Sequence, residues 1–188
     1  MDDIEDLLDC AEYGVLALSK GVTPYSVPVN FVRVDKFIYF HGSKNGRKMD
    51  YLRCNKNISF SVTKPYSIIP SYFSSKDGLA CPATHFFKSV VIDGFADIEL
   101  DKSEKIKALS ALMKKLQSEG GYKSLDESIY KKAIDATEVV KIVPYNIKLK
   151  VKVGQKLPDS RYNLIIEHLS KRAEAIDLET IEVMKRYR

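Results

Sequence analysis

Three short runs of β-forming residues near the N-terminus constrain the fold of this 188-residue chain more than any other feature. They are rich in Val, Tyr and Phe and cover Gly14 to Ser19, Tyr25 to Val34 and Phe37 to Gly42. Lys20-Gly21, with Pro24, joins the first two runs, and Asp35-Lys36 joins the last two. Short connections of this kind form β-hairpins. The N-terminal part is therefore predicted to be an antiparallel meander.

Helical patterns flank and interrupt these strands. Residues 2–12 predict a helix that Asp2 or Asp3 caps and that ends before Gly14. Residues 44–54 predict a second helix, with Met49, Leu52 and Arg53 packing inward. Further helices are expected from Asp101 to about Gln117, over about 124–135 and, as one or two segments, over 160–187.

The remaining strands are predicted from Asn57 to Thr63, from His85 to Leu100 and from Val139 to Val153. The second can be one strand or two joined at Gly94, and the third can be a pair or one strand bent at Pro144. Residues 64–82 carry three prolines and several serines, so we expect a long loop there.

This order of elements predicts an α+β fold: a mostly antiparallel, closed or partly closed β-barrel with peripheral helices. Apolar residues form 45% of the chain, which is enough for a packed core and excludes disorder. We expect residues 1–155 to form the barrel domain and residues 156–188 to form a C-terminal helical extension.

Composition also indicates where the protein works. The three cysteines, Cys10, Cys54 and Cys81, are scattered and form no CxxC motif, so reduced thiols are expected and a disulfide framework is not. The first residues are acidic, unlike a signal peptide, and no apolar run reaches the length of a membrane span. We therefore expect a cytoplasmic protein with no membrane partner. The net charge of +5 fits an anionic ligand or a nucleic-acid patch equally well.

The segment Ile38 to Leu52 carries the clearest chemistry. A strand ends, Gly42 and Gly46 loosen the turn, and a helix begins with Lys44, Arg47 and Lys48. A helix N-terminus offers free backbone N–H groups to an anion, and Ser43 adds a hydroxyl. Cations at this end of a helix oppose its dipole, and a bound dianion removes that cost. The segment is a candidate phosphate cradle.

Two other interpretations of this segment compete with the cradle. A nucleotide-triphosphate P-loop is disfavoured because the spacing from Gly42 to Gly46 is one residue short. In addition, Arg47 replaces the required Lys and Met49 replaces Ser or Thr. A solvated basic turn with no ligand is the remaining alternative, and the sequence leaves both it and the cradle open.

Several segments together resemble the pyridoxamine 5′-phosphate oxidase-like split-barrel flavoproteins, most of all the branch of the nitroimidazole-resistance (Nim) proteins. The resemblance lies, in order, in Gly14 to Ser19, Pro24 to Val32, Ile38 to Leu52, Ala80-Cys81-Pro82 and Phe87 to Ala96. It covers about residues 10–117. The resemblance implies an FMN-binding split barrel that forms a homodimer, with the flavin at the subunit interface.

The resemblance also assigns positions. It implies that Ser43, Arg47 and Lys48 hold the FMN phosphate, with Ser89 near the same site. The strand segment Pro28, Val29 and Asn30 matches the backbone that lines the flavin ring, and His41 matches a histidine beside the flavin in Nim-type proteins. Pyridoxamine 5′-phosphate oxidases carry a C-terminal Arg and His motif that has no counterpart in Lys185-Arg186-Tyr187-Arg188. Vitamin B6 oxidation is therefore not implied.

From this we expect an FMN-dependent oxidoreductase that acts on a small organic molecule of the nitroaromatic type, without a nucleic-acid partner. His41 is the candidate proton donor, because the pKa of histidine lies near neutrality. Two alternatives remain: a haem-binding or haem-degrading split barrel, with His41, His85 or His168 as axial ligand, and a non-catalytic flavin carrier or sensor.

The other candidate residues carry weaker signals. Cys81 and His85 have the spacing of half a zinc site, but no second pair is visible, so no metal is expected. His168 is expected to be a surface or packing residue. Several aromatics can form either a lid over a planar ring or part of the core: Tyr66, Tyr72, Phe73, Phe86 and Phe87.

Overall fold

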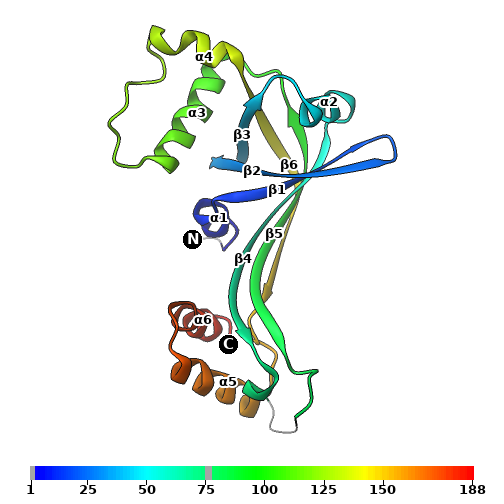
Figure 1. Cartoon of the computed structure of the whole chain (residues 1–188), viewed down its shortest axis with the longest axis vertical. Helices are drawn as coiled ribbons and strands as arrows, with labels where there is room; N and C mark the ends of the chain where they lie inside the picture. The colour runs from blue at the N-terminus through cyan, green and yellow to red at the C-terminus, as the bar shows by residue number, and fades with distance from the viewer. Residues whose placement is uncertain (1–2, 75–77) are drawn as a thin grey trace. The chain divides into compact units, whose positions relative to one another are not determined.

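The computed structural model describes residues 3–74 and 78–188. Its helices and strands follow one another along the chain as α1 (Asp3–Cys10), β1 (Tyr13–Lys20), β2 (Thr23–Val34), β3 (Phe37–Ser43), α2 (Arg47–Cys54), β4 (Asn57–Ile69), β5 (Thr84–Asp97), α3 (Lys102–Leu116), α4 (Lys131–Ala136), β6 (Thr137–Lys152), α5 (Asp159–Arg172) and α6 (Ala175–Arg186). Short 3₁₀ turns cover Ser71–Phe73 and Ser128–Tyr130. The predicted α+β class is confirmed (Figure 1).

The strands form one antiparallel sheet in the order β1-β2-β3-β6-β5-β4, and β4 pairs back with β1, so the sheet closes. The first hairpin turns at Gly21 and the second at Asp35, both in left-handed backbone conformation, as the hairpin turns of the sequence require. The predicted meander is therefore confirmed.

The chain divides into two compact units. Unit 1 consists of Met1–Val62 and Val90–Lys148, and unit 2 consists of Thr63–Ser89 and Leu149–Arg188. Strands β4, β5 and β6 contribute residues to both units. Unit 2 contains the whole of the predicted extension 156–188, together with residues 63–89 and 149–155.

In unit 1, alternate residues of the strands fill the barrel interior. Phe31 and Phe60 meet there edge to face, with ring centroids 5.0 Å apart. On the outer surface, α3 packs against β2 and β3 (Figure 1). Tyr39 fixes this contact, because its hydroxyl donates a hydrogen bond of 2.8 Å to Glu104 on α3, which Lys141 also binds at 2.6 Å. Burial and the Glu104 carboxylate raise the pKa of Tyr39, which keeps the hydroxyl protonated.

Several boundaries differ from the sequence predictions. Helix α1 begins at Asp3; residue 2, where the prediction began, lies outside the described residues. Helix α2 begins at Arg47, not residue 44, and Arg53 is exposed on it instead of packing inward, while Met49 and Leu52 are buried as predicted. Strand β5 is single and passes Gly94 unbroken, where a Cβ atom would lie 2.9 Å from the carbonyl oxygen of Val143. Strand β6 is also single.

The largest correction concerns the loop predicted over 64–82. Strand β4 continues to Ile69, so the prediction was wrong for 64–69; residues 75–77 of the predicted loop lie outside the described residues. Pro65 is tolerated because its nitrogen faces the same strand edge as that of Ser67. There the Ser67 N–H donates to a side chain, Thr180 Oγ1, at 2.9 Å, and not to a strand.

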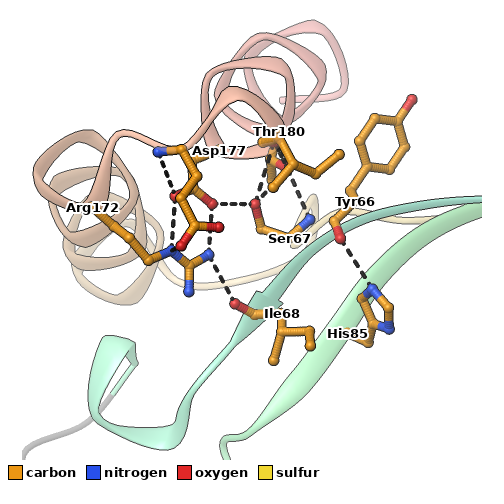
Figure 2. Close-up of polar contacts among 9 residues, drawn as sticks. Tyr66, Ser67, Ile68, His85, Arg172, Asp177 and Thr180 are labelled. Atoms are coloured by element: carbon orange, nitrogen blue, oxygen red, sulfur yellow. Dashed lines mark hydrogen bonds and ion pairs between the residues drawn. The ribbon is translucent and has the colours of Figure 1, made fainter.

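Unit 2 packs α5 and α6 against each other and carries its own apolar core, which includes Phe73, Phe86, Ile165, Leu169 and Met184. Phe86 is therefore a core residue, which is one of the two alternatives that the sequence leaves open. Figure 2 shows a polar network at the same place. Asp177 is fully buried and accepts hydrogen bonds from Arg172, at 2.6 and 2.7 Å, and from Ser67, at 2.5 Å.

This network fixes the helical hairpin to β4. Arg172 also donates to the carbonyl oxygen of Ile68, at 3.2 Å, and the Thr180 hydroxyl lies 2.8 Å from that of Ser67. The Arg172 guanidinium is the main reason that the pKa of Asp177 lies below its ordinary value. Within the described residues, no helix combines the length and apolarity needed to span a bilayer.

Candidate functional site

The turn between β3 and α2 places the predicted basic residues. Gly46 caps α2 with a φ of 107°, a conformation that glycine adopts easily, and the Ser43 hydroxyl accepts the backbone N–H of Asn45 at 3.2 Å. Arg53, in the last turn of α2, donates to the carbonyl oxygen of Lys44 at 2.5 Å. Helix α2 starts at Arg47, three residues after the predicted start at residue 44, so Lys44 lies in the turn that precedes the helix.

Lys48 is held against the barrel. Its ammonium lies 5.0 Å from the centre of the Phe40 ring and 2.9 Å from the point where a Cβ on Gly42 would sit, so a side chain at position 42 would displace it. Partial burial lowers the pKa of Lys48. Among residues 3–74 and 78–188, no carboxylate pairs with this ammonium.

Arg47 lies on two tyrosine rings. Its guanidinium is 4.3 Å from the centre of the Tyr25 ring and 5.5 Å from that of Tyr51, whose hydroxyl it also approaches at 3.4 Å. Stacking fixes the plane of a guanidinium and leaves N–H groups at its edge available to an acceptor. Arg47, too, has no carboxylate partner in the described part of the chain. Two positioned and uncompensated cations thus lie in the first turn of α2.

His41 precedes this turn on β3, opposite Val139 of β6, and it is exposed. Partial desolvation, with a smaller contribution from the Lys48 charge, lowers the pKa of His41 below its ordinary value. The imidazole is therefore mainly neutral at pH 7. The structure brings Gly42 and Lys48 together and places His41 close enough for the Lys48 charge to act on it.

The other predicted residues lie on neighbouring strands. Pro28, Val29 and Asn30 of β2 pair with β1, and the Asn30 amide donates to the carbonyl oxygen of Glu12 at 2.7 Å. Asn30 lines a cavity of about 380 Å³ with Asp9, Cys10, Glu12, Tyr13, Lys115 and Leu116. Ser89 is half-buried on β5, in unit 2.

Lys44 lines a different cavity, of about 260 Å³, together with Leu100, Lys102, Lys105, Ile134 and Asp135. Lys102 and Lys105 were not among the residues predicted from the sequence. A signal was present in the lysine directly after the cap Asp101, where a cation opposes the helix dipole.

The remaining candidates, His85, Cys81 and His168, lie in unit 2. His85 lies with Nε2 3.0 Å from the carbonyl oxygen of Tyr66, to which it donates (Figure 2), and Cys81 is exposed. No group of three potential metal ligands occurs within the described residues. His168 stacks on Phe73 with centroids 4.6 Å apart, which confirms a packing contact.

Known proteins share this arrangement of strands and helices. A family model described as pyridoxamine 5′-phosphate oxidase matches residues 1–151. The search of curated proteins finds no match. Among solved structures, a candidate 5-nitroimidazole antibiotic resistance protein from Bacteroides thetaiotaomicron superposes with a TM-score of 0.64 at 19% identity, covering 79% of this chain and 82% of that one.

Two further structures share the fold. The flavocytochrome Anf3 from Azotobacter vinelandii has a TM-score of 0.67 at 22% identity and covers 80% of this chain and 67% of its own. A protein from Mycobacterium smegmatis that binds FAD and haem has a TM-score of 0.60 at 19% identity, with 79% and 69% covered.

Proposed function

This chain belongs to the pyridoxamine 5′-phosphate oxidase family, and we propose that it is an FMN-dependent oxidoreductase acting on a small organic molecule of the nitroaromatic type. The family match confirms the resemblance seen in the sequence and extends it from about residue 117 to residue 151. Solved structures with the same fold include proteins named for FAD binding, such as one from Mesorhizobium loti. Their names support a flavin.

One observation carries the proposal: Arg47 and Lys48 are positioned cations that pair with no carboxylate in the described part of the chain. Cations at a helix N-terminus oppose the helix dipole and cost stability, and lysine is rarely desolvated without a partner. A phosphate dianion at this turn satisfies both residues. Ser43 and the first N–H groups of α2 then supply neutral donors. The residues therefore fit the phosphate end of FMN.

A bound flavin supplies two-electron, hydride-type chemistry. The chain has three tasks around it in our proposal. Arg47 and Lys48 hold the phosphate, the backbone of Pro28 to Asn30 lines the ring, and His41 delivers a proton to the reduced substrate. Ser89 stays a predicted member of the phosphate set. The lowered pKa of His41 means that its protonated form is scarce at pH 7 in the free protein.

A haem-binding function is the second candidate, because two proteins of the same fold are named as a flavocytochrome and as an FAD and haem binding protein. His41 is the favoured axial ligand, because its ring forms no hydrogen bond with the described residues. His85 is also exposed, but its Nε2 is engaged with Tyr66, and His168 is stacked on Phe73. A Soret band that His41→Ala removes would favour this function over the flavin.

We also propose that the protein is a homodimer with the flavin at the subunit interface. Strands β1, β5 and β6 support this, because in unit 1 they expose apolar side chains that face solvent in a monomer: Val15, Val91, Phe95, Tyr145 and Ile147. Light scattering should give twice the mass of the chain, and Phe95→Glu should shift it toward the monomer. A wild-type monomer with full flavin occupancy would refute this assembly.

The direct test of the cofactor is a titration of the purified protein with FMN and riboflavin, followed by fluorescence. Each charge-assisted hydrogen bond to the phosphate contributes about 1.5–3 kcal/mol. FMN should therefore bind at least about tenfold more tightly than riboflavin. Equal affinities would mean that the β3–α2 turn does not hold the phosphate.

A further inference from the structure

The cavity beside Lys44 has the composition of an anion site. Lys44, Lys102 and Lys105 line it from the β3–α2 turn and from the first turn of α3. Buried Leu100 and Ile134 provide an apolar floor, since they are 8% and 3% exposed. This combination of ammonium groups with an apolar surface suits a phosphorylated organic group better than a free inorganic ion.

The charges in the cavity do not balance. Lys105 pairs with Glu138 at 2.9 Å, and both side chains are largely buried, at 17% and 13% exposed. In the described part of the chain, neither Lys44 nor Lys102 forms an ion pair, and Asp135 is the one carboxylate in the lining. The cavity therefore keeps a positive charge, with Lys102 at a helix start where the dipole disfavours it.

The register of the sheet places this cavity next to the phosphate cradle. On the ladder between β3 and β6, Gly42 pairs with Glu138 and Ser43 pairs with Thr137. Glu138 thus has its backbone beside the cradle and its carboxylate on Lys105 of the cavity. Lys44, the residue after Ser43, reaches the cavity from the cradle itself. The two cationic sites are therefore neighbours along the ladder between β3 and β6.

We propose that the cavity of Lys44, Lys102 and Lys105 is a second anion site, which binds the phosphate groups of a phosphorylated organic molecule beside the flavin phosphate. In the setting of the proposed oxidoreductase, on which this inference rests, that molecule is a dinucleotide, because such an enzyme takes one as electron donor or as cofactor. Lysine binds phosphate as a point charge, so the site distinguishes the presence of phosphate more than the shape of the nucleotide.

The experiment titrates flavin-loaded protein with ADP by calorimetry, because ADP carries the phosphates and adenylate but no redox group. Lys102→Gln removes one unpaired ammonium without disturbing the Lys105–Glu138 pair. It should weaken ADP binding about tenfold or more and leave the FMN affinity unchanged. The matched control is Lys107→Gln on the same helix, an exposed residue that pairs with Asp35. It should change neither affinity.

Each other result counts against the proposal. Absence of ADP binding to the loaded protein, or equal losses in Lys102→Gln and Lys107→Gln, would overturn it. If Lys102→Gln instead weakened FMN, the cavity would be part of the cradle and not a second site. The same ADP titration on flavin-free Lys48→Met protein, with and without Lys102→Gln, separates this proposal from the flavin function. In that protein, ADP binding that depends on Lys102 should persist even if the chain binds no flavin.

Two sources of the adenylate group are then distinguished. If the nucleotide is the electron donor, Lys102→Gln should raise the KM for NADH or NADPH about tenfold with kcat unchanged, since uniform binding is lost. If it is the distal half of the cofactor, the same variant should weaken FAD about tenfold and leave FMN and both donors unaffected. Either pattern supports the site. If Lys102→Gln affects none of NADH, NADPH and FAD, the dinucleotide assignment is overturned.

Discussion

Replacing Lys48 by Met separates ligand binding from stability in a way that the structure makes quantitative. The substitution keeps most of the side-chain volume and removes the charge. Loss of the contact with the Phe40 ring costs about 0.5–1 kcal/mol at a partly exposed site. Removal of a cation from the first turn of α2 returns about 0.3–1 kcal/mol. The free energy of unfolding of the flavin-free protein should therefore stay within about 0.5 kcal/mol of wild type.

FMN binding should respond very differently. Loss of one charge-assisted hydrogen bond to the phosphate, about 1.5–3 kcal/mol, lowers the affinity roughly 10- to 150-fold. The loss should shrink as salt rises, because salt screens partly exposed charges. Riboflavin affinity should not change, so the variant and the phosphate form a double-mutant cycle whose coupling energy is the contact itself.

The assay is a pair of fluorescence titrations, with urea unfolding of the flavin-free protein. Lys20→Met is the control: it removes the same charge from an exposed residue at the first hairpin turn. If Lys48→Met destabilised the protein by more than about 1 kcal/mol and left FMN binding intact, Lys48 would be a structural residue. The phosphate cradle would then lose its main support.

The remaining predictions concern His41 and the polar network of unit 2. If His41 delivers a proton, His41→Ala should retain FMN while pre-reduced protein is reoxidised by a nitroaromatic compound roughly 10² more slowly in anaerobic stopped flow; an unchanged rate removes His41 from the mechanism. Because the folded protein holds the pKa of His41 below that of the unfolded chain, stability should fall as pH drops below about 6.5, and this slope should lessen in His41→Ala when urea unfolding is compared at pH 7 and 5. Asp177→Ala should lower the free energy of unfolding by about 3 kcal/mol, since it removes the fully buried carboxylate to which Arg172 and Ser67 donate; a change below about 1 kcal/mol would contradict that role.

The barrel could be predicted because its signals are local. Asp35-Lys36 and Lys20-Gly21 dictate hairpins whatever follows them, and the alternation of β1 to β3 fixes which side chains face inward. Strand β4 shows the limit. Pro65 is a strand breaker in isolation, but it is accepted at an edge where Thr180, 113 residues from Ser67, replaces a strand as hydrogen-bond partner. The local sequence around Pro65 gives no indication of that distant partner.

The two cationic sites show the same division within function. Ser43, Arg47 and Lys48 fall within six residues, so the sequence alone is enough to propose a phosphate site there, with a solvated basic turn as the alternative. Lys102 and Lys105 acquire meaning only through the register that sets Glu138 opposite Gly42, which brings α3 beside the cradle. Both sites share one feature: a cation in the first turn of a helix, where it opposes the helix dipole. Where such a cation has no carboxylate partner in the described fold, a bound anionic ligand is the simplest source of the compensating negative charge. The Lys48 and Lys102 variants test that argument at two independent positions.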